Sequence, residues 1–156
     1  MGRYGSFKEY LKAEYKGPFC ATDILIQYAG GIVLIDRKFE PLGLAIPGGI
    51  AEYMPLTENA VKEAKEETGL DVILDEPDRP FCVLSDPKQD PRAFVASITY
   101  TAKGEGVLKP HKDEDALSAK AYTLEEITNL LQGNKIAFEH HKKILRKYIE
   151  NEGYVK

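Results

Sequence analysis

The stretch PGGIAEYMPLTENAVKEAKEETGL, residues 47–70, carries the strongest pattern in the chain. Side chains three and four residues apart lie on the same face of a helix, so Glu63, Glu66 and Glu67 are expected to converge. Like charges at this spacing repel one another unless a cation lies among them. The Pro-Gly-Gly sequence ahead of the helix forms a tight loop that can bring backbone carbonyl groups to the same point. A glycine loop followed by a carboxylate-lined helix predicts a magnesium site suited to phosphate chemistry.

The composition is that of one ordinary globular domain. The chain has 156 residues, of which 43% are hydrophobic and 29% charged, enough for a proper core over residues 1–156. A net charge of −4 argues against bulk attraction to nucleic acid or to an anionic membrane. No apolar run approaches the roughly 18 residues of a membrane span, and the N-terminus lacks an apolar signal core. Two cysteines are too few for a disulfide framework. We therefore expect a cytoplasmic protein that binds neither nucleic acid nor membrane.

Short β-branched and apolar runs predict strands on both sides of the glutamate-bearing segment. Ala29-Gly30 separates the first two runs and indicates a hairpin. The predicted strands span residues 22–28, 31–36, 44–46, 71–74, 81–84, 93–102 and 120–122.

Three helices are expected. The first spans residues 56–68, with Gly69 at the position that ends a helix. A capping box at residues 123–126 begins the second, which runs toward Leu131. Apolar residues at helical spacing predict a C-terminal helix over residues 136–150. With residues 1–18 as an N-terminal extension, this order predicts a mixed sheet flanked by helices, an α/β or α+β sandwich.

The segment at residues 47–70 resembles the Nudix box, usually written G-x5-E-x7-R-E-U-x-E-E-x-G-U with U aliphatic. Further stretches between about residues 19 and 145 resemble bacterial and archaeal ADP-ribose pyrophosphatases, among them residues 85–92 and 137–140. The residues that match the second half of the box are Glu63, Glu66, Glu67, Gly69 and Leu70, and those that match its usual entry are Pro47, Gly48 and Gly49.

The box is partly degenerate. Lys62 stands at the family's arginine and Met54 at its first glutamate, and the stretch from Gly49 to Lys62 is one residue shorter than the family spacing. In the family that glutamate and arginine support the loop and helix, chiefly as an ion pair. Both partners have changed together, which is coherent because losing one alone would leave an unpaired charge. Lys62 also lacks the planar, bidentate fork of arginine.

The resemblance implies a set of metal ligands. Glu63 and Glu67 would be direct magnesium ligands, and Glu66 would be a ligand or a neighbour that acts through water. The carbonyl of Gly48 would complete the inner shell. Hard oxygen ligands favour magnesium or manganese over zinc. The alternative interpretation of the three glutamates is a solvated acidic helix face.

Three further residues are candidates for substrate binding. Arg37 follows an apolar strand, where a guanidinium can fork onto a phosphate, although a surface ion pair is the alternative. Arg92 could also bind a phosphate, or could hold its own loop through Asp86 or Asp90. Glu52, three residues after Gly49, is either a substrate or metal contact or an ordinary surface carboxylate.

A charged segment at residues 112–115 precedes the last predicted strand. ADP-ribose hydrolases of the family often draw a catalytic carboxylate from a mobile loop in this region, which makes Glu114 the first candidate and Asp113 the second. A solvated turn is the alternative. Together with Glu63 and Glu66, Glu114 completes the predicted catalytic set, in which Glu114 or Glu63 accepts the proton of water.

The three histidines show no ligand spacing with cysteine or with one another. His140 and His141 are adjacent, so we expect them to point apart on the helix and form no zinc site. The aromatic residues are expected to lie mostly in the core.

The resemblance as a whole implies a Nudix α/β/α sandwich with a mixed sheet and a magnesium- or manganese-dependent hydrolase. Its substrate would be a nucleoside diphosphate linked to another group, with ADP-ribose, cleaved to AMP and ribose 5-phosphate, as the leading candidate. A nucleoside triphosphate or a dinucleoside polyphosphate is an alternative substrate. A degenerate domain that binds a nucleotide without hydrolysis is a second alternative. A homodimer is a further expectation, because relatives often build the site across two subunits.

Overall fold

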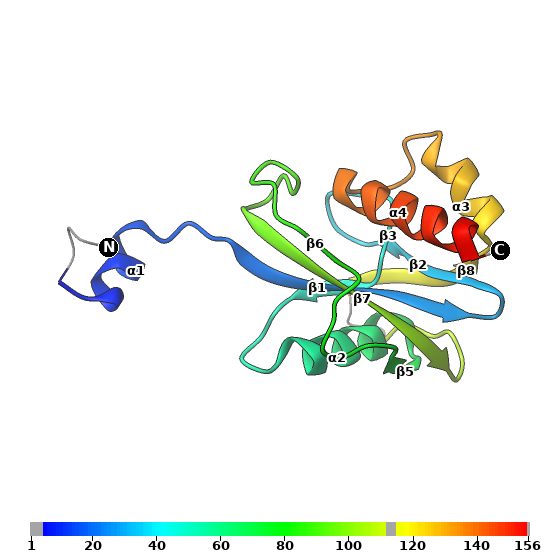
Figure 1. The fold of residues 1–156 in the computed structure, drawn as a ribbon, viewed down its shortest axis with the longest axis horizontal. Helices are drawn as coiled ribbons and strands as arrows, with labels where there is room; N and C mark the ends of the chain where they lie inside the picture. The colour runs from blue at the N-terminus through cyan, green and yellow to red at the C-terminus, as the bar shows by residue number, and fades with distance from the viewer. Residues whose placement is uncertain (1–4, 112–114, 156) are drawn as a thin grey trace.

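The computed structural model describes residues 5–111 and 115–155, and its centre is a mixed β-sheet between two helical layers (Figure 1). Strand β1 (Phe19–Tyr28) runs parallel to β7 (Val95–Glu105), in a register that pairs Phe19 with Val95 and Gln27 with Lys103. A hairpin at residues 29–30 joins β1 to β2 (Gly31–Arg37), as the sequence predicts. The pairing of β1 with β7 makes the sheet mixed.

The sheet divides along one edge of β1. Because β7 occupies the other edge, β2 and a short strand, β4 (Gly48–Ile50), share this one. β2 pairs only with residues 27–28 of β1, whereas β4 pairs with residues 21–23. The remaining strands pair antiparallel: β3 (Leu44–Ala45) and β8 (Ala116–Tyr122) with β2, and β5 (Asp71–Leu74) and β6 (Cys82–Leu84) with β7. The residues of the glycine loop thus enter at the split.

The helices cover the two faces of the sheet. On one face lies α2 (Leu56–Thr68), and on the other lie α3 (Leu124–Leu131) and α4 (Glu139–Val155). Side chains alternate along β1, so Ile24 packs in the core beneath α2 while Leu25 packs in the core beneath α3 and α4. Apolar burial on both faces therefore fixes the register of the central strand.

The local helix signals of the sequence are confirmed. α2 has the predicted bounds, and Gly69 ends it in a left-handed conformation (φ 78°), with its N–H bonded to the Lys65 carbonyl. The capping box of α3 is present, because Thr123 and Glu126 bond reciprocally through side chain and backbone. None of the helices in the described part of the chain is long and apolar enough to cross a membrane.

Two local predictions are wrong. The C-terminal helix begins at Glu139 rather than at residue 136, because the backbone around Ile136 is bonded to β3. The Leu44 N–H donates to the Lys135 carbonyl, and the Leu44 carbonyl accepts the Ala137 N–H. Ile136 is buried although it precedes the helix, so its place in the apolar pattern reflects the core and not the helix. The Pro-Gly-Gly segment is also more than a loop, since Gly48 and Gly49 belong to β4.

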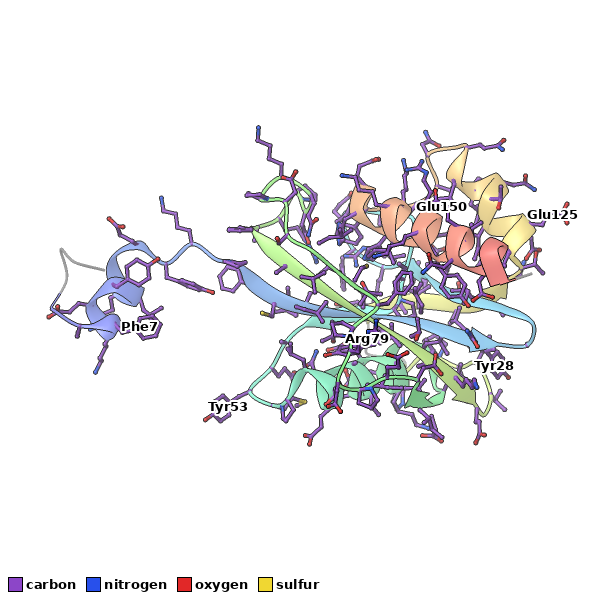
Figure 2. All side chains as sticks on the ribbon, viewed as in Figure 1. Phe7, Tyr28, Tyr53, Arg79, Glu125 and Glu150 are labelled. Atoms are coloured by element: carbon purple, nitrogen blue, oxygen red, sulfur yellow. The ribbon has the colours of Figure 1, made fainter. Side chains whose placement is uncertain are left out.

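The N-terminal extension contains a helix that the sequence analysis did not anticipate. This helix, α1 (Phe7–Glu14), begins at Ser6, whose hydroxyl accepts the Glu9 N–H. It lies apart from the sheet and the other helices (Figure 1). Phe7 is exposed on it, as is Tyr53 on the loop between β4 and α2 (Figure 2).

Candidate functional site

The glycine loop is pressed between the sheet and α2. Gly48 pairs with Asp23 on β1, and Gly49 pairs with Thr22. A β-carbon on Gly48 would lie 2.5 Å from Oδ1 of Asp23, and one on Gly49 would lie 2.6 Å from Cδ of Glu63. Gly48 also faces the backbone of Thr22 and Asp23, so glycine is required there for close approach, whereas a β-carbon on Gly49 would displace the carboxyl group of Glu63. The loop and the carboxyl group of Glu63 are therefore in direct contact.

Glu67 is buried beneath this loop and accepts a hydrogen bond from the Gly48 N–H at 2.9 Å. Burial raises the pKa of Glu67 to about 8; the Gly48 bond opposes that rise, while the negative charges of Glu63, Asp23 and Asp115 add to it. A cation at this position would relieve both the burial and the repulsion. The donors are carboxylate and carbonyl oxygens, so the site fits magnesium or manganese.

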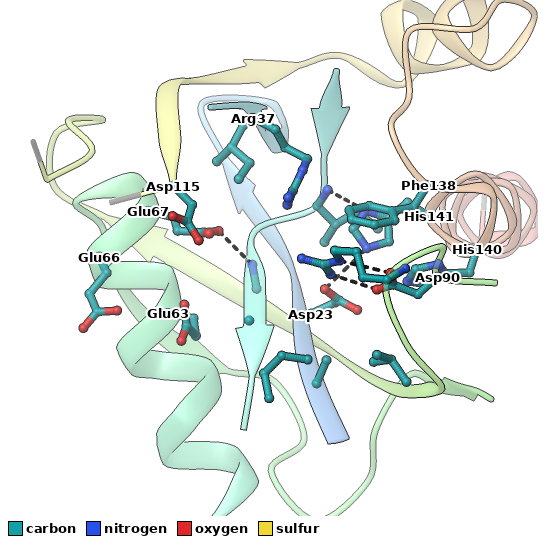
Figure 3. A pocket seen from close by; sticks show the side chains of 18 of the residues that line it. Asp23, Arg37, Glu63, Glu66, Glu67, Asp90, Asp115, Phe138, His140 and His141 are labelled. Carbon is teal, nitrogen blue, oxygen red and sulfur yellow. Dashed lines mark hydrogen bonds and ion pairs between the residues drawn. The ribbon is translucent and has the colours of Figure 1, made fainter. Parts of the chain in front are cut away.

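The predicted metal ligands lie together. Glu63, Glu66, Glu67 and Gly48 all line one pocket of about 320 Å³. Figure 3 shows the three glutamates along α2, with Glu67 bonded to the glycine loop. Their common place on the pocket follows from their helical spacing, while their role as metal ligands stays a prediction.

Lys62 joins the helix to the loop. Its Nζ lies 2.7 Å from Oε1 of Glu66 and 3.3 Å from Oε2 of Glu52. These contacts, led by the hydrogen bond to Glu66, raise the pKa of Lys62. A loop–helix ion pair is thus present despite Met54, because Glu52 supplies the carboxylate. Glu52 also lines the pocket, and its predicted substrate or metal contact stays a prediction.

Two guanidinium groups, those of Arg37 and Arg92, line the same pocket. Figure 3 shows Arg37 across the pocket from the glutamates of α2. Arg37 donates from Nε to the Pro41 carbonyl at 2.7 Å, and its Cζ lies 4.9 Å from the centroid of the Phe138 ring. Arg92 lies over the same ring at 5.2 Å. Its Nε and one terminal nitrogen bond to the two oxygens of Asp90 at 3.0 and 2.8 Å. Of the two suggested partners of Arg92, the structure therefore selects Asp90.

The predicted catalytic residue Glu114, like Asp113, lies outside the described residues. The next residue, Asp115, lines the pocket and lies beside Glu67 (Figure 3). The sequence analysis gave Asp115 no role, although it ends the charged segment that suggested Glu114.

The expectation that His140 and His141 point apart is wrong. Their ring centroids are 4.5 Å apart, both side chains are buried, and both line the pocket. Successive helical residues diverge by only about 100°, and these two lie in the first turn of α4, where both rings pack on Phe138. One potential ligand atom from each histidine and one from the buried Asp23 lie within 4.8 Å of one another. The signal missed in the sequence was a lone carboxylate, Asp23, inside an apolar strand.

The split mixed sheet, the helices on both faces and the glycine loop before a glutamate-bearing helix define the fold class of the Nudix hydrolases. The sequence model of the NUDIX domain matches residues 20–148, and the chain belongs to this family. The predicted Nudix α/β/α sandwich is thereby confirmed. No curated protein matches the sequence.

Several solved structures share this fold. A NUDIX hydrolase from Nitrosomonas europaea superposes with a TM-score of 0.74 at 21% identity, covering 90% of this chain and 75% of that one. An ADP-ribose pyrophosphatase from Streptococcus suis gives 0.65 at 21% identity, with coverage of 87% and 92%. The NUDIX domain of Shewanella oneidensis NrtR, crystallised with ADP-ribose, gives 0.70 at 17% identity, with coverage of 94% and 98%.

Proposed function

We propose that this protein hydrolyses a nucleoside diphosphate linked to another group, with ADP-ribose as the leading substrate. The observation that carries the proposal is the division of charge within one pocket. Glutamates of α2 line one side, and Arg37 lies opposite them (Figure 3). Arg92 also lines the pocket and lies over the same Phe138 ring as Arg37. A diphosphate carries negative charge that needs cations on both sides, and a metal at the glutamates with a guanidinium group opposite would supply them.

The metal would be held by Glu63, Glu66, Glu67 and the Gly48 carbonyl, all in contact with the pocket. A divalent cation bound there offsets the charge of a diphosphate and acidifies water. The protein's own part is to keep Glu67 buried and bonded to Gly48, so that the carboxylate has one orientation.

Hydrolysis requires water to add to one phosphorus atom while the bond from that phosphorus to the bridging oxygen breaks. The bridging oxygen leaves with the electron pair, and a carboxylate accepts the proton of water. Glu63 is suited to this role because it lies against Gly49 at the pocket. Glu114, which precedes Asp115 in the sequence, is the alternative acceptor. With ADP-ribose the products would be AMP and ribose 5-phosphate.

One observation favours binding without hydrolysis as a second candidate. Lys62 holds Glu66 at 2.7 Å, so an ammonium group already neutralises one of the proposed metal ligands. If this pair persists when metal is added, Glu66 would not coordinate the ion. The site would then bind metal more weakly and still bind the nucleotide.

Product analysis over a substrate panel tests the proposal. The purified protein is incubated with magnesium or manganese and ADP-ribose, dATP or diadenosine polyphosphate, and the products are separated by chromatography. Preferential release of AMP from ADP-ribose supports the proposal, while equal turnover of dATP overturns the substrate assignment. Binding of ADP-ribose by calorimetry with no turnover of any substrate would establish the second candidate.

A further inference from the structure

A buried polar cluster lines the same pocket beside the glycine loop and takes no part in the hydrolysis proposed above. It consists of Asp23 on β1 and of His140 and His141 at the start of α4. All three residues are almost fully buried, at 6%, 4% and 3% exposed. Burying a carboxylate is unfavourable unless it is paired or hydrogen-bonded, so the cluster needs a structural or chemical reason.

The hydrogen bonds of His141 determine where its proton lies. Nδ1 accepts the backbone N–H of Ile46 at 3.1 Å, so this nitrogen carries a lone pair. In the neutral ring the proton is then on Nε2, which lies 3.4 Å from Oδ1 of Asp23 (Figure 3). His141 therefore lies between the two groups. Its Nε2–H faces the carboxylate of Asp23, and its Nδ1 accepts the backbone N–H of Ile46.

Asp23 is held from the other side as well. The Ser97 hydroxyl on β7 donates to its Oδ2. Both oxygens of the carboxylate are thus engaged, Oδ2 by the Ser97 hydroxyl and Oδ1 by the approach of Nε2 of His141 at 3.4 Å. A carboxylate placed in this way beside a histidine orients its ring.

This proton placement argues against a metal at the cluster. A metal ligand needs a lone pair on the coordinating nitrogen, and Nε2 of His141 carries the proton as long as Nδ1 accepts from Ile46. A metal would thus have to break the Ile46 bond. The cluster is better suited to holding backbone than to holding an ion.

The backbone that it holds leads into the proposed metal site. Three consecutive residues are each fixed by a different element: Ile46 N–H by His141 of α4, the Pro47 carbonyl by Ile24 N–H of β1, and Gly48 N–H by Glu67 of α2. The bonds from β1 and α2 to Pro47 and Gly48 do not involve His141. The bond to Ile46 is what ties α4 to this segment through a side chain.

We propose that His141, oriented by Asp23, is a positioning residue that fixes residues 46–48 so that the Gly48 carbonyl and Glu67 meet the metal together. This inference rests on the proposed metal site, but not on any substrate. Replacing a residue that orients a metal ligand without touching the metal typically weakens metal affinity roughly 10- to 100-fold.

His140 provides a matched control in the same chain. It is the neighbouring residue, is as buried as His141 and packs on the same Phe138 ring. Its Nδ1 has no hydrogen-bond partner among the described residues, and the side-chain bond to Ile46 comes from His141 instead. Replacing it removes an equal buried volume without releasing residues 46–48.

The first test is the tautomer of His141 in the unmodified protein. Nitrogen NMR of the imidazole rings near neutral pH should show His141 as the Nε2–H tautomer, with a lone pair on Nδ1. An Nδ1–H tautomer would overturn the proposal, because Ile46 could not then donate to this ring. This measurement requires neither a variant nor catalysis.

The second test compares manganese binding by calorimetry in His141→Leu, His141→Asn and His140→Leu, with thermal unfolding measured in parallel. We expect roughly 10- to 100-fold weaker manganese binding for His141→Leu. Binding should recover in part for His141→Asn, whose side-chain oxygen can accept the Ile46 N–H, and should be nearly unchanged for His140→Leu.

Equal manganese affinity in His141→Leu and the unmodified protein would overturn the proposal. A stoichiometry one ion lower in both leucine variants would also overturn it and would make the cluster a metal site. If the His141 variants behave as expected and no nucleotide is hydrolysed, the positioning role stands while the proposed function fails.

Discussion

Nζ of Lys62 lies 3.3 Å from Oε2 of Glu52, so an ion pair ties the glycine loop to the glutamate-bearing helix. The family pattern places the partner carboxylate at the position held here by Met54. The stretch from Gly49 to Lys62 is one residue shorter, and a carboxylate two residues before Met54 reaches the lysine instead. The loop–helix connection is thus kept by a different residue.

Replacing Glu52 by Gln should therefore impair hydrolysis more than it impairs folding. Both partners are partly exposed, so the ion pair contributes at most about 1 kcal/mol to stability. Its loss would free Lys62 to bind Glu66 alone and compete with the metal. Steady-state kinetics should show reduced kcat for Glu52→Gln and no gain for Met54→Glu. Higher activity in Met54→Glu would mean that the family position still determines the loop.

Metal binding should release a proton from Glu67. Its pKa of about 8 keeps it largely protonated at neutral pH, and a metal ligand must be deprotonated. Titrating manganese by calorimetry in buffers of different ionisation enthalpy measures the number of protons released. We expect close to one proton near pH 7 for the unmodified protein, and none together with much weaker binding for Glu67→Gln. Identical proton release in the two proteins would contradict the assignment.

The same residue should govern part of the pH dependence of stability without metal. The folded-state pKa of about 8 lies above the ordinary 4.5, so protonated Glu67 favours the folded state. Its contribution is full below about pH 4.5 and is lost as pH rises through about 8, where each unit of pKa difference is worth about 1.4 kcal/mol. Urea unfolding with a chelator should show the free energy of unfolding of the unmodified protein falling relative to Glu67→Gln over this range. Parallel curves would show that Glu67 is not perturbed.

The features that the sequence predicted are those with local signals. The bounds of α2 follow from its apolar spacing and from the glycine at residue 69, and the start of α3 follows from its capping box. The Lys62–Glu52 pair could not be predicted, because it depends on how a shortened loop folds back onto the helix. The buried cluster at Asp23 likewise depends on how α4 lies on the sheet, which no spacing along the chain records.

Arg92 should bind the anionic substrate, and Asp90 should improve that binding by holding the guanidinium in place. The two bonds at 3.0 and 2.8 Å fix the guanidinium in the pocket. A hydrogen bond to a charged group is worth about 1.5–3 kcal/mol, so Arg92→Met should raise KM for ADP-ribose roughly 10- to 100-fold. Asp90→Asn should raise KM less. Arg79→Met is the control, because Arg79 is exposed and pairs only with Glu76 among the described salt bridges. A KM for Arg92→Met equal to that of Arg79→Met would show that Arg92 does not bind the substrate.

Gly49→Ala should disable the site through the position of Glu63. The added β-carbon would lie 2.6 Å from Cδ and 2.8 Å from both oxygens of this carboxyl group, so the carboxyl group must move. A displacement of about 1 Å at a reacting group can lower the rate about 100-fold, and we expect a loss of that order in kcat together with weaker manganese binding. Gly133→Ala is the matched control, since its β-carbon would lie 3.8 Å from the nearest atom, an ordinary contact. Thermal unfolding of both variants should remain cooperative. Full activity in Gly49→Ala would show that Glu63 acts from a position other than the one against Gly49, and the proposed role of Glu63 would then be wrong.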